Sequence, residues 1–174
     1  MTNKNKKGFT IIEVVLVLAI AGLIFLMVFI ALPALQRSQR NTQRADDMAR
    51  IKTAINQYQA NNGGRLPFST SDSATWAPDS NFIKRYIDSS CTGGSGTAPQ
   101  SCGKEFKDPD GSVYKFANAM PPTNVSQPNH TIYVQLKAKC GTTEGTRATG
   151  SGNRDYAMFY IMEGGQIRCF DQTN

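Results

Sequence analysis

The sequence is poor in the residues that most enzymes use for catalysis. It contains a single histidine, His130, which follows Pro128 and Asn129 and is expected in a solvated loop. No H-E-x-x-H motif is present, and the glycine-rich run at 93–96 lacks the lysine of a phosphate-binding loop. The adjacent carboxylates Asp46 and Asp47 would not face each other on a helix. The sequence therefore predicts neither an enzyme nor a cofactor.

Charge is absent from a long segment near the N-terminus. The residues from Val14 to Leu35 include no Asp, Glu, Lys or Arg. As a helix they would extend about 33 Å, which is enough to cross a bilayer. One carboxylate, Glu13, lies at the start of this segment, and a charge at the centre of a membrane costs about 2.5–3.5 kcal/mol. Such a residue suggests a function, although in an ordinary membrane anchor a glutamate at this depth could reach the interface.

The residues around this carboxylate read Lys6-Lys7-Gly8-Phe9-Thr10-Ile11-Ile12-Glu13 and resemble the N-terminus of prepilins. Prepilins are the precursors of type IV pilins and of the pseudopilins of type II secretion. The resemblance implies that a prepilin peptidase removes a leader formed by residues 1–8 and cuts between Gly8 and Phe9. The same peptidase would methylate the α-amine of Phe9. In the filament, Glu13 would pair with the N-terminal amine of a neighbouring subunit, because a buried carboxylate needs a cation.

The helix is expected to continue beyond the apolar segment. Residues 9–35 would form its transmembrane and filament-core half, and residues 36–62 an amphipathic second half. An apolar stripe at helical spacing marks this second half: Met48, Ile51, Ile55 and Tyr58. The polar residues predicted to lie elsewhere on the helix are Arg44, Lys52 and Gln59. The helix should end near Asn62-Gly63-Gly64, with Pro67 just beyond.

The distribution of charge indicates a membrane orientation, although the arginines that follow the apolar segment weaken this signal. Lysine and arginine outnumber aspartate and glutamate by 19 to 13, which gives a formal charge of +6. The leader lysines Lys4, Lys6 and Lys7 place that end in the cytoplasm, and their removal would leave +3, too little to predict nucleic-acid binding. Four arginines cluster on the helix: Arg37, Arg40, Arg44 and Arg50. We expect them to meet anionic lipid headgroups or acidic residues of a partner.

All four cysteines follow the apolar helix, on the side predicted to be exported: Cys91, Cys102, Cys140 and Cys169. An even number of cysteines in an oxidising compartment indicates two disulfides, for which three pairings are possible. A Cys91–Cys102 bond would close a small Gly/Ser loop, and a Cys140–Cys169 bond would clamp the C-terminal strands. Zinc is not expected, because no C-x-x-C spacing is present.

Residues 63–174 are predicted to form a globular head. A short helix is expected over Asn81–Asp88 with Ser80 as its N-cap. The string Lys107–Ser112 has Asp108, a proline, Asp110 and a glycine in the order of a type I turn. It resembles an element of the major pseudopilins of type II secretion, in which nearby loops can hold calcium. Asp108 and Asp110 could supply oxygen ligands, but two carboxylates are too few to predict a metal site over a plain turn.

The C-terminal third has the alternation of β-strands. Strands are predicted over Thr131–Lys139, Asp155–Glu163 and Gln166–Phe170, with a two-residue hairpin turn at Gly164-Gly165. The first should place Ile132, Val134, Leu136 and Ala138 on one face. The expected fold class is α+β: a long N-terminal helix, membrane-spanning in its first half, packed on a small antiparallel sheet, as the resemblance to pilins also implies.

The resemblance implies a subunit that polymerises through its N-terminal helix into an extracellular filament used for adhesion, motility or DNA uptake. Its partners would be other copies of the chain, the prepilin peptidase, the platform and assembly ATPase of the inner membrane, and lipid before assembly. The precursor would lie in the cytoplasmic membrane with its head outside the cytoplasm. The alternative is a pseudopilin of a type II secretion or competence system. A membrane-anchored binding module that does not polymerise is a third reading.

Overall fold

The structure is a computed structural model that describes residues 8–68, 78–90, 106–125, 128–150 and 152–172. The leader residues 1–7 and the segment with Cys91 and Cys102 lie outside these ranges, so the predicted Cys91–Cys102 bond does too. The described chain begins with one long helix, α1 (Ile11–Asn61), and continues with short helices and six strands. It forms two compact units that divide after Gln39.

The first unit contains α1 up to Gln39. Its apolar side chains are exposed on all sides of the helix, including those of Leu16, Phe25 and Ile30. The helix passes through Pro33 without a break. Among the described residues, α1 is long and apolar enough to cross a membrane, and no residue of its most apolar stretch is buried. An apolar surface of this extent is typical of a membrane span or a helix–helix interface.

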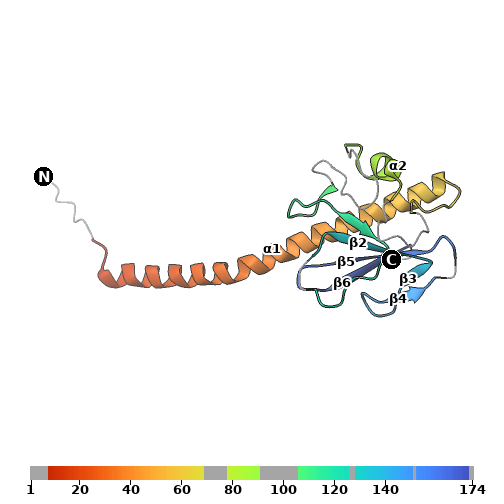
Figure 1. The fold of residues 1–174 in the computed structure, drawn as a ribbon. Helices are drawn as coiled ribbons and strands as arrows, with labels where there is room; N and C mark the ends of the chain where they lie inside the picture. The colour runs from red at the N-terminus through yellow and green to blue at the C-terminus, as the bar shows by residue number, and fades with distance from the viewer. Residues whose placement is uncertain (1–7, 69–77, 91–105, 126–127, 151, 173–174) are drawn as a thin grey trace. The chain divides into compact units, whose positions relative to one another are not determined.

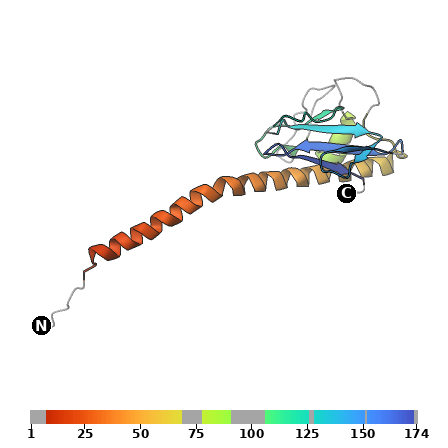
Figure 2. The same ribbon diagram turned by 90° about the horizontal axis from the view of Figure 1, so that it is seen from below.

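The second unit begins with the rest of α1, residues 40–61, which packs against a sheet (Figures 1 and 2). The predicted apolar stripe is confirmed, since Met48, Ile51 and Ile55 are fully buried and Tyr58 is partly buried against the same core. The prediction for Arg44 is wrong: this residue lies on the buried face of α1. It precedes Met48 by one turn of helix and therefore extends the stripe toward the N-terminus.

The helix ends as its glycines predict. Gly63 and Gly64 both have positive φ, and the Gly64 N–H donates to the Gln59 carbonyl at 2.7 Å. This bond spans five residues and is typical of a glycine-terminated helix, because only glycine adopts the left-handed conformation without cost.

The second predicted helix forms as two short pieces, α2 (Ser80–Phe82) and a π-helical turn, η1 (Ile83–Ile87). The helix begins at Ser80, one residue before its predicted start, and the described capping contacts come from Asp79. The Asp79 carboxylate accepts the Asn81 N–H at 2.9 Å, and the Asp79 carbonyl accepts the Phe82 N–H. Aspartate is as good an N-cap as serine, so local preference alone does not fix the position.

The main sheet has four strands in the order β1-β2-β5-β6: β1 (Lys115–Ala117), β2 (Thr131–Leu136), β5 (Tyr156–Ile161) and β6 (Ile167–Asp171). The pairs β2·β5 and β5·β6 are antiparallel, as predicted. The pair β1·β2 is parallel, so the sheet is mixed and not purely antiparallel. The α+β class is confirmed.

Strand β5 lies at the centre of two apolar clusters and is buried along its whole length. On one face, Met158 and Tyr160 join Ile132, Val134 and the stripe of α1. On the other face, Ala157 and Phe159 join a smaller cluster. A strand covered on both sides has few polar residues, which explains the continuous apolar run of β5.

The structure divides the predicted strand Thr131–Lys139 at Lys137. This residue has φ of 53°, and its N–H and carbonyl bond to Asp155 and Gly150. The chain then leaves the main sheet as β3 (Ala138–Cys140), which pairs with β4 (Arg147–Thr149). A left-handed residue resets the alternation, so Ala138 packs with the smaller cluster and not with Ile132 and Val134.

The turn between β5 and β6 also differs from its prediction by one residue. Met162 N–H donates to the Gln166 carbonyl, so the loop consists of Glu163, Gly164 and Gly165 and has three residues. Both glycines have positive φ, which only glycine adopts readily. The extra residue places the Glu163 carboxylate beside α1.

Candidate functional site

The N-terminus of α1 is closed by a reciprocal pair of hydrogen bonds between Thr10 and Glu13. The Thr10 N–H and hydroxyl each donate to Glu13 Oε2 at 2.8 Å, and the Glu13 N–H faces Thr10 Oγ1 at 3.4 Å. This is a capping box, in which a threonine and a glutamate three residues later satisfy each other's backbone groups. The capping box fixes the first helical residue at Ile11.

The predicted cleavage position lies immediately before this cap. Gly8, Phe9 and Thr10 are exposed and outside the helix, and the Phe9 side chain is 91% exposed. A peptide bond in an exposed, non-helical segment is accessible to a peptidase, whereas a helical bond must first unfold. The Gly8–Phe9 bond therefore lies where it can be cut without disturbing α1.

The carboxylate of Glu13 has hydrogen-bond partners in the uncleaved chain. Its Oε2 accepts two hydrogen bonds from Thr10, and its position in the first turn of α1 interacts favourably with the helix dipole. An acidic residue that also caps the helix can be retained next to an apolar segment at lower cost than an isolated one.

The head contains a second charged cluster, centred on Arg44, which is 2% exposed. Its Nε and Nη2 donate to the two oxygens of Asp108 at 2.7 and 2.8 Å. Its Nη1 donates to Glu163 Oε1 at 2.8 Å. Arg40, one turn earlier on α1, donates to both oxygens of Glu163 at 2.6 and 2.8 Å. We call these residues the Arg44 cluster: Arg40, Arg44, Asp108 and Glu163.

The cluster changes the interpretation of the helix arginines. For Arg40 and Arg44, the expectation of lipid headgroups or a partner's acidic residues is wrong, because both are paired with carboxylates of their own chain. Arg44 is bidentate to Asp108 and Arg40 is bidentate to Glu163, and such paired hydrogen bonds make specific contacts. The cluster therefore holds α1 residues 40–61 on the turn at Asp108 and on the loop after β5.

The ion pairs govern the titration of both carboxylates. The hydrogen bonds from Arg40, and then those from Arg44, lower the pKa of Glu163 to about 2 against the opposing effect of partial burial. Burial works to raise the pKa of Asp108, but hydrogen bonds from Arg44 and Tyr160 hold it below its usual value. The Tyr160 hydroxyl donates to Asp108 Oδ2 at 2.7 Å. Both carboxylates are therefore charged at neutral pH.

A tyrosine–aspartate pair lies beside the cluster. The Tyr114 hydroxyl donates to Asp47 Oδ2 at 2.9 Å, and Arg50 approaches Asp47 at 3.7 Å. Burial raises the pKa of Asp47, and the tyrosine and Arg50 oppose this rise. Like Arg44, Asp47 connects α1 to the chain segment before β1.

The segment Asp108–Gly111 forms the predicted turn. The Gly111 N–H donates to the Asp108 carbonyl at 2.7 Å, and the Asp110 N–H donates to Asp108 Oδ1 at 3.2 Å. Asp108, Asp110 and His130 bring possible ligand atoms within 4.8 Å of one another. Both oxygens of Asp108 already accept hydrogen bonds, and for this reason we propose no calcium site on Asp108 and Asp110. His130 lies in a loop, as expected, and its side chain is partly buried, with 28% of it exposed.

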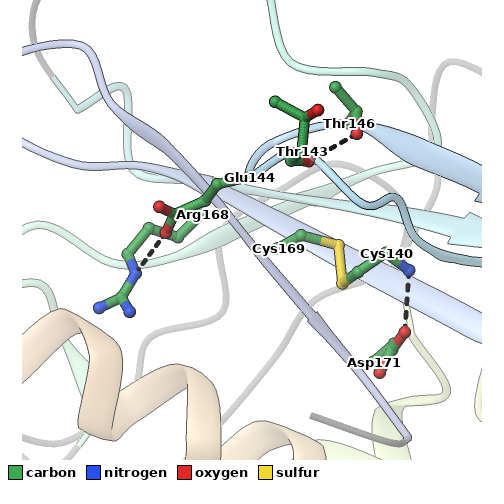
Figure 3. Close-up of a disulfide and its surroundings, with 7 residues drawn as sticks. All are labelled: Cys140, Thr143, Glu144, Thr146, Arg168, Cys169 and Asp171. Atoms are coloured by element: carbon green, nitrogen blue, oxygen red, sulfur yellow. Dashed lines mark hydrogen bonds and ion pairs between the residues drawn. A yellow bond between two sulfur atoms is a disulfide. The ribbon is translucent and has the colours of Figure 1, made fainter.

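The structure joins Cys140 of β3 to Cys169 of β6, which is one of the two bonds suggested by the sequence (Figure 3). The Cys140 N–H also donates to the buried Asp171 carboxylate at 2.8 Å. These two contacts fasten the small β3·β4 sheet to the edge of the main sheet. The two cysteines are 29 residues apart in the sequence. A disulfide that closes a loop of this length restricts the unfolded chain and so stabilises the head.

Comparison with known proteins identifies the N-terminal region. Residues 3–29 match the family described as the prokaryotic N-terminal methylation motif, the prepilin-type signal of type IV pilins and pseudopilins. The match contains Gly8, Phe9, Thr10 and Glu13, and so includes the candidate cleavage position and the capping box. No curated protein and no solved structure matches the chain.

Proposed function

We propose that the chain is the precursor of a type IV pilin subunit that polymerises through α1 into an extracellular filament. The observation that carries the proposal is the methylation motif at residues 3–29, located on an exposed segment that precedes a capped, apolar helix. The motif with this helix supports a membrane-anchored precursor of a pilin or pseudopilin.

The proposed processing follows from the geometry of the N-terminus. A prepilin peptidase would cut between Gly8 and Phe9, release the leader 1–8 and methylate the Phe9 amine. Because Thr10 caps the helix, cleavage would leave α1 intact. The new amine would then stand one residue from Thr10, whose N–H contacts Glu13 in the precursor.

The exposed apolar surface of residues 11–35 supports the proposed assembly. Before assembly this surface would be covered by lipid, and in the filament by the equivalent helices of other copies. Glu13 would then exchange its contact with Thr10 for the N-terminal amine of a neighbouring subunit. An inner-membrane platform and an assembly ATPase would drive this transfer out of the membrane, with the head outside the cytoplasm.

The head, residues 63–174 with the later part of α1, would form the outer surface of the filament. The Arg44 cluster and the Cys140–Cys169 bond support this role, because a surface subunit must keep its fold outside the cytoplasm. No catalytic role is proposed for it.

A pseudopilin of a secretion or competence system is the second candidate, and the turn Asp108–Gly111 favours it by its resemblance to major pseudopilins. Deletion of the chain separates the two candidates. Loss of surface filaments with normal protein secretion would support the pilin, and loss of secretion without loss of surface filaments would support the pseudopilin.

The assembly role is tested by Glu13→Ala in the native host. We expect normal cleavage at Gly8–Phe9 but a strong loss of sheared filaments, because the neighbouring amine would have no carboxylate partner. Glu144→Ala is the matched control, since Glu144 is an exposed glutamate of the head whose partners among the described residues are Arg168 and Gln166 of β6 and the loop before it. Normal filament yield from the Glu13 variant would contradict the proposed assembly.

A further inference from the structure

The chain leaves α1 through an exposed asparagine–glycine pair. Asn62 and Gly63 directly follow the last helical residue, Asn61, and both are exposed. Gly63 has φ of 64°, and a Cβ at this position would meet no atom within 4 Å beyond its immediate neighbours in the chain. Asn62 is the only asparagine of the sequence that is followed by glycine. The peptide bond between the two residues is therefore hindered neither by packing nor by a side chain on its second residue.

The hydrogen bonds of this turn leave one backbone N–H out. The N–H groups of Asn62 and Gly64 both donate to the Gln59 carbonyl, at 3.3 and 2.7 Å. The Arg65 N–H donates to the Asn62 carbonyl at 3.2 Å. Between these bonds, the Gly63 N–H has no hydrogen-bond partner among the described residues. Because Gly63 is exposed, its N–H is left to solvent, and a base in solvent can reach it.

The side chain of Asn62 is held by one exposed hydrogen bond. Its Nδ2 donates to the Tyr58 carbonyl at 2.8 Å, and its Oδ1 accepts no hydrogen bond from the described residues. A single exposed hydrogen bond contributes little, because water replaces either partner. Once this bond opens, rotation about the Cα–Cβ bond of Asn62 turns Cγ toward the Gly63 nitrogen. These two atoms can then close a five-membered ring with the Cβ, Cα and carbonyl carbon of Asn62.

We propose that Asn62 is a self-modification site of the head, which converts to aspartate and isoaspartate without an enzyme. Asparagine is among the thermolabile residues of proteins. The Gly63 nitrogen loses its proton to a base in solvent and bonds to Asn62 Cγ. The Cγ–Nδ2 bond breaks, and Nδ2 takes up a proton and leaves as ammonia.

One water then opens the cyclic imide at either of its carbonyl groups. Opening at Cγ restores the original backbone and leaves aspartate. Opening at the backbone carbonyl of residue 62 leaves isoaspartate, in which the chain continues through Cγ. The reaction consumes one water, releases one ammonia and involves no oxidation or reduction.

Both products loosen the end of α1. Aspartate lacks the donor to the Tyr58 carbonyl, and its charge lies at the negative end of the helix dipole. Isoaspartate also adds one carbon to the backbone before Gly63, whose carbonyl accepts from Arg154 Nη2 at 3.3 Å, and before Gly64, whose N–H closes the helix. The modification thus weakens the contact between α1 and the segment before β5. The site lies in the head and does not depend on the proposed assembly.

Incubation of the full chain in detergent micelles in ¹⁸O-labelled water, followed by peptide mapping with mass spectrometry, tests the site. We expect labelled aspartate and isoaspartate at Asn62, formed at least about tenfold faster than at Asn124, which is also exposed but precedes the β-branched Val125. The presence of both products distinguishes the cyclic route from direct hydrolysis, which gives aspartate alone. Asn62→Gln should give no labelled product at this position, because its longer side chain cannot close a five-membered ring.

Comparison with the chain unfolded in guanidinium chloride separates the effect of the structure from that of the sequence. Because the Gly63 N–H has no partner in the folded head, we expect the folded chain to convert at a rate within about threefold of the unfolded chain. Conversion of Asn62 in the folded chain as slow as that of Asn124, with rapid conversion only after unfolding, would overturn the proposal. That result would mean that the turn protects the pair.

Amide hydrogen exchange measures the structural consequence. In the converted chain, the Gly64 amide should exchange about fivefold faster than in the unconverted chain, because the bond to the Gln59 carbonyl is weakened. Exchange at Ile51, which the core holds, should be the same in both. Equal exchange at Gly64 before and after conversion would contradict the loosening of the helix end.

Discussion

The two parts of α1 show how one helix is adapted to two environments. Residues 11–35 expose apolar side chains on every side, and their one carboxylate is satisfied locally by Thr10. Residues 40–61 are apolar on one face only, and the charge on that face, Arg44, is satisfied by Asp108 and Glu163, which lie far away in the sequence. Under the proposed function, the first segment moves from lipid into a filament, so its charge needs a partner within the same segment. A segment fixed in a head can use partners from the whole fold.

The largest expected effect comes from breaking the distant pairing. Arg44→Ala would leave the Asp108 carboxylate buried without its cation, which typically costs about 3–5 kcal/mol. Urea unfolding of the full chain in micelles measures this loss.

Arg37→Ala is the matched control, since Arg37 is exposed and lies before the head. We expect it to change head stability by less than about 0.5 kcal/mol. Similar small effects for the two arginines would mean that the Arg44 cluster does not hold α1 to the sheet.

An intermediate effect is expected on acidification. The pKa of Glu163 is about 2 and that of Asp108 is lowered, so both carboxylates stabilise the head fully above about pH 4.5. This stabilisation is lost as pH falls through the folded-state values, because the unfolded carboxylates take up protons first. The urea concentration at the unfolding midpoint of the head should therefore decrease as the pH is lowered from about 4.5 to about 2.

Glu163→Gln should weaken that acid dependence, and Glu144→Gln, on an exposed glutamate, should not. An acid dependence identical in all three proteins would show that the Arg44 cluster does not control it.

The smallest effect concerns the local pairing. Thr10→Ala removes the cap and should destabilise the first turn of α1 by about 1 kcal/mol, whereas Thr10→Ser should retain it. Amide exchange at residues 11–14 in micelles should be about fivefold faster in the alanine variant than in the serine variant. Exchange at Ile51 should be equal in the two, since that part of α1 is held by the core. Equal exchange at the first turn would contradict the capping box.

Features set by neighbours in the chain were predictable from the sequence. The stripe of α1, its end at Gly63 and Gly64, the Asp108 turn and the β5 strand follow from spacing and turn chemistry. Arg44 was missed because a polar residue was expected to face solvent, although its spacing from Met48 marks the buried face. Its partner Asp108 is 64 residues away in the sequence, and no pattern among neighbouring residues predicts such a pair.

The remaining differences also arise from long-range contacts. The strand break at Lys137 depends on hydrogen bonds to Asp155 and Gly150. The position of His130 depends on the parallel pairing of β1 and β2, which the sequence did not predict. The N-terminal site, by contrast, was predictable from the sequence, because the motif, the cap and the candidate cleavage position all lie within a few residues of one another.

The central claim is that the chain is processed and assembled through its N-terminus. The most direct test is the intact mass and N-terminal peptide spectrum of the protein in filaments sheared from its native host. We predict a chain that begins at Phe9 and carries one methyl group on its α-amine. A chain found only in the membrane fraction with residues 1–8 retained would contradict the claim and indicate an ordinary membrane anchor.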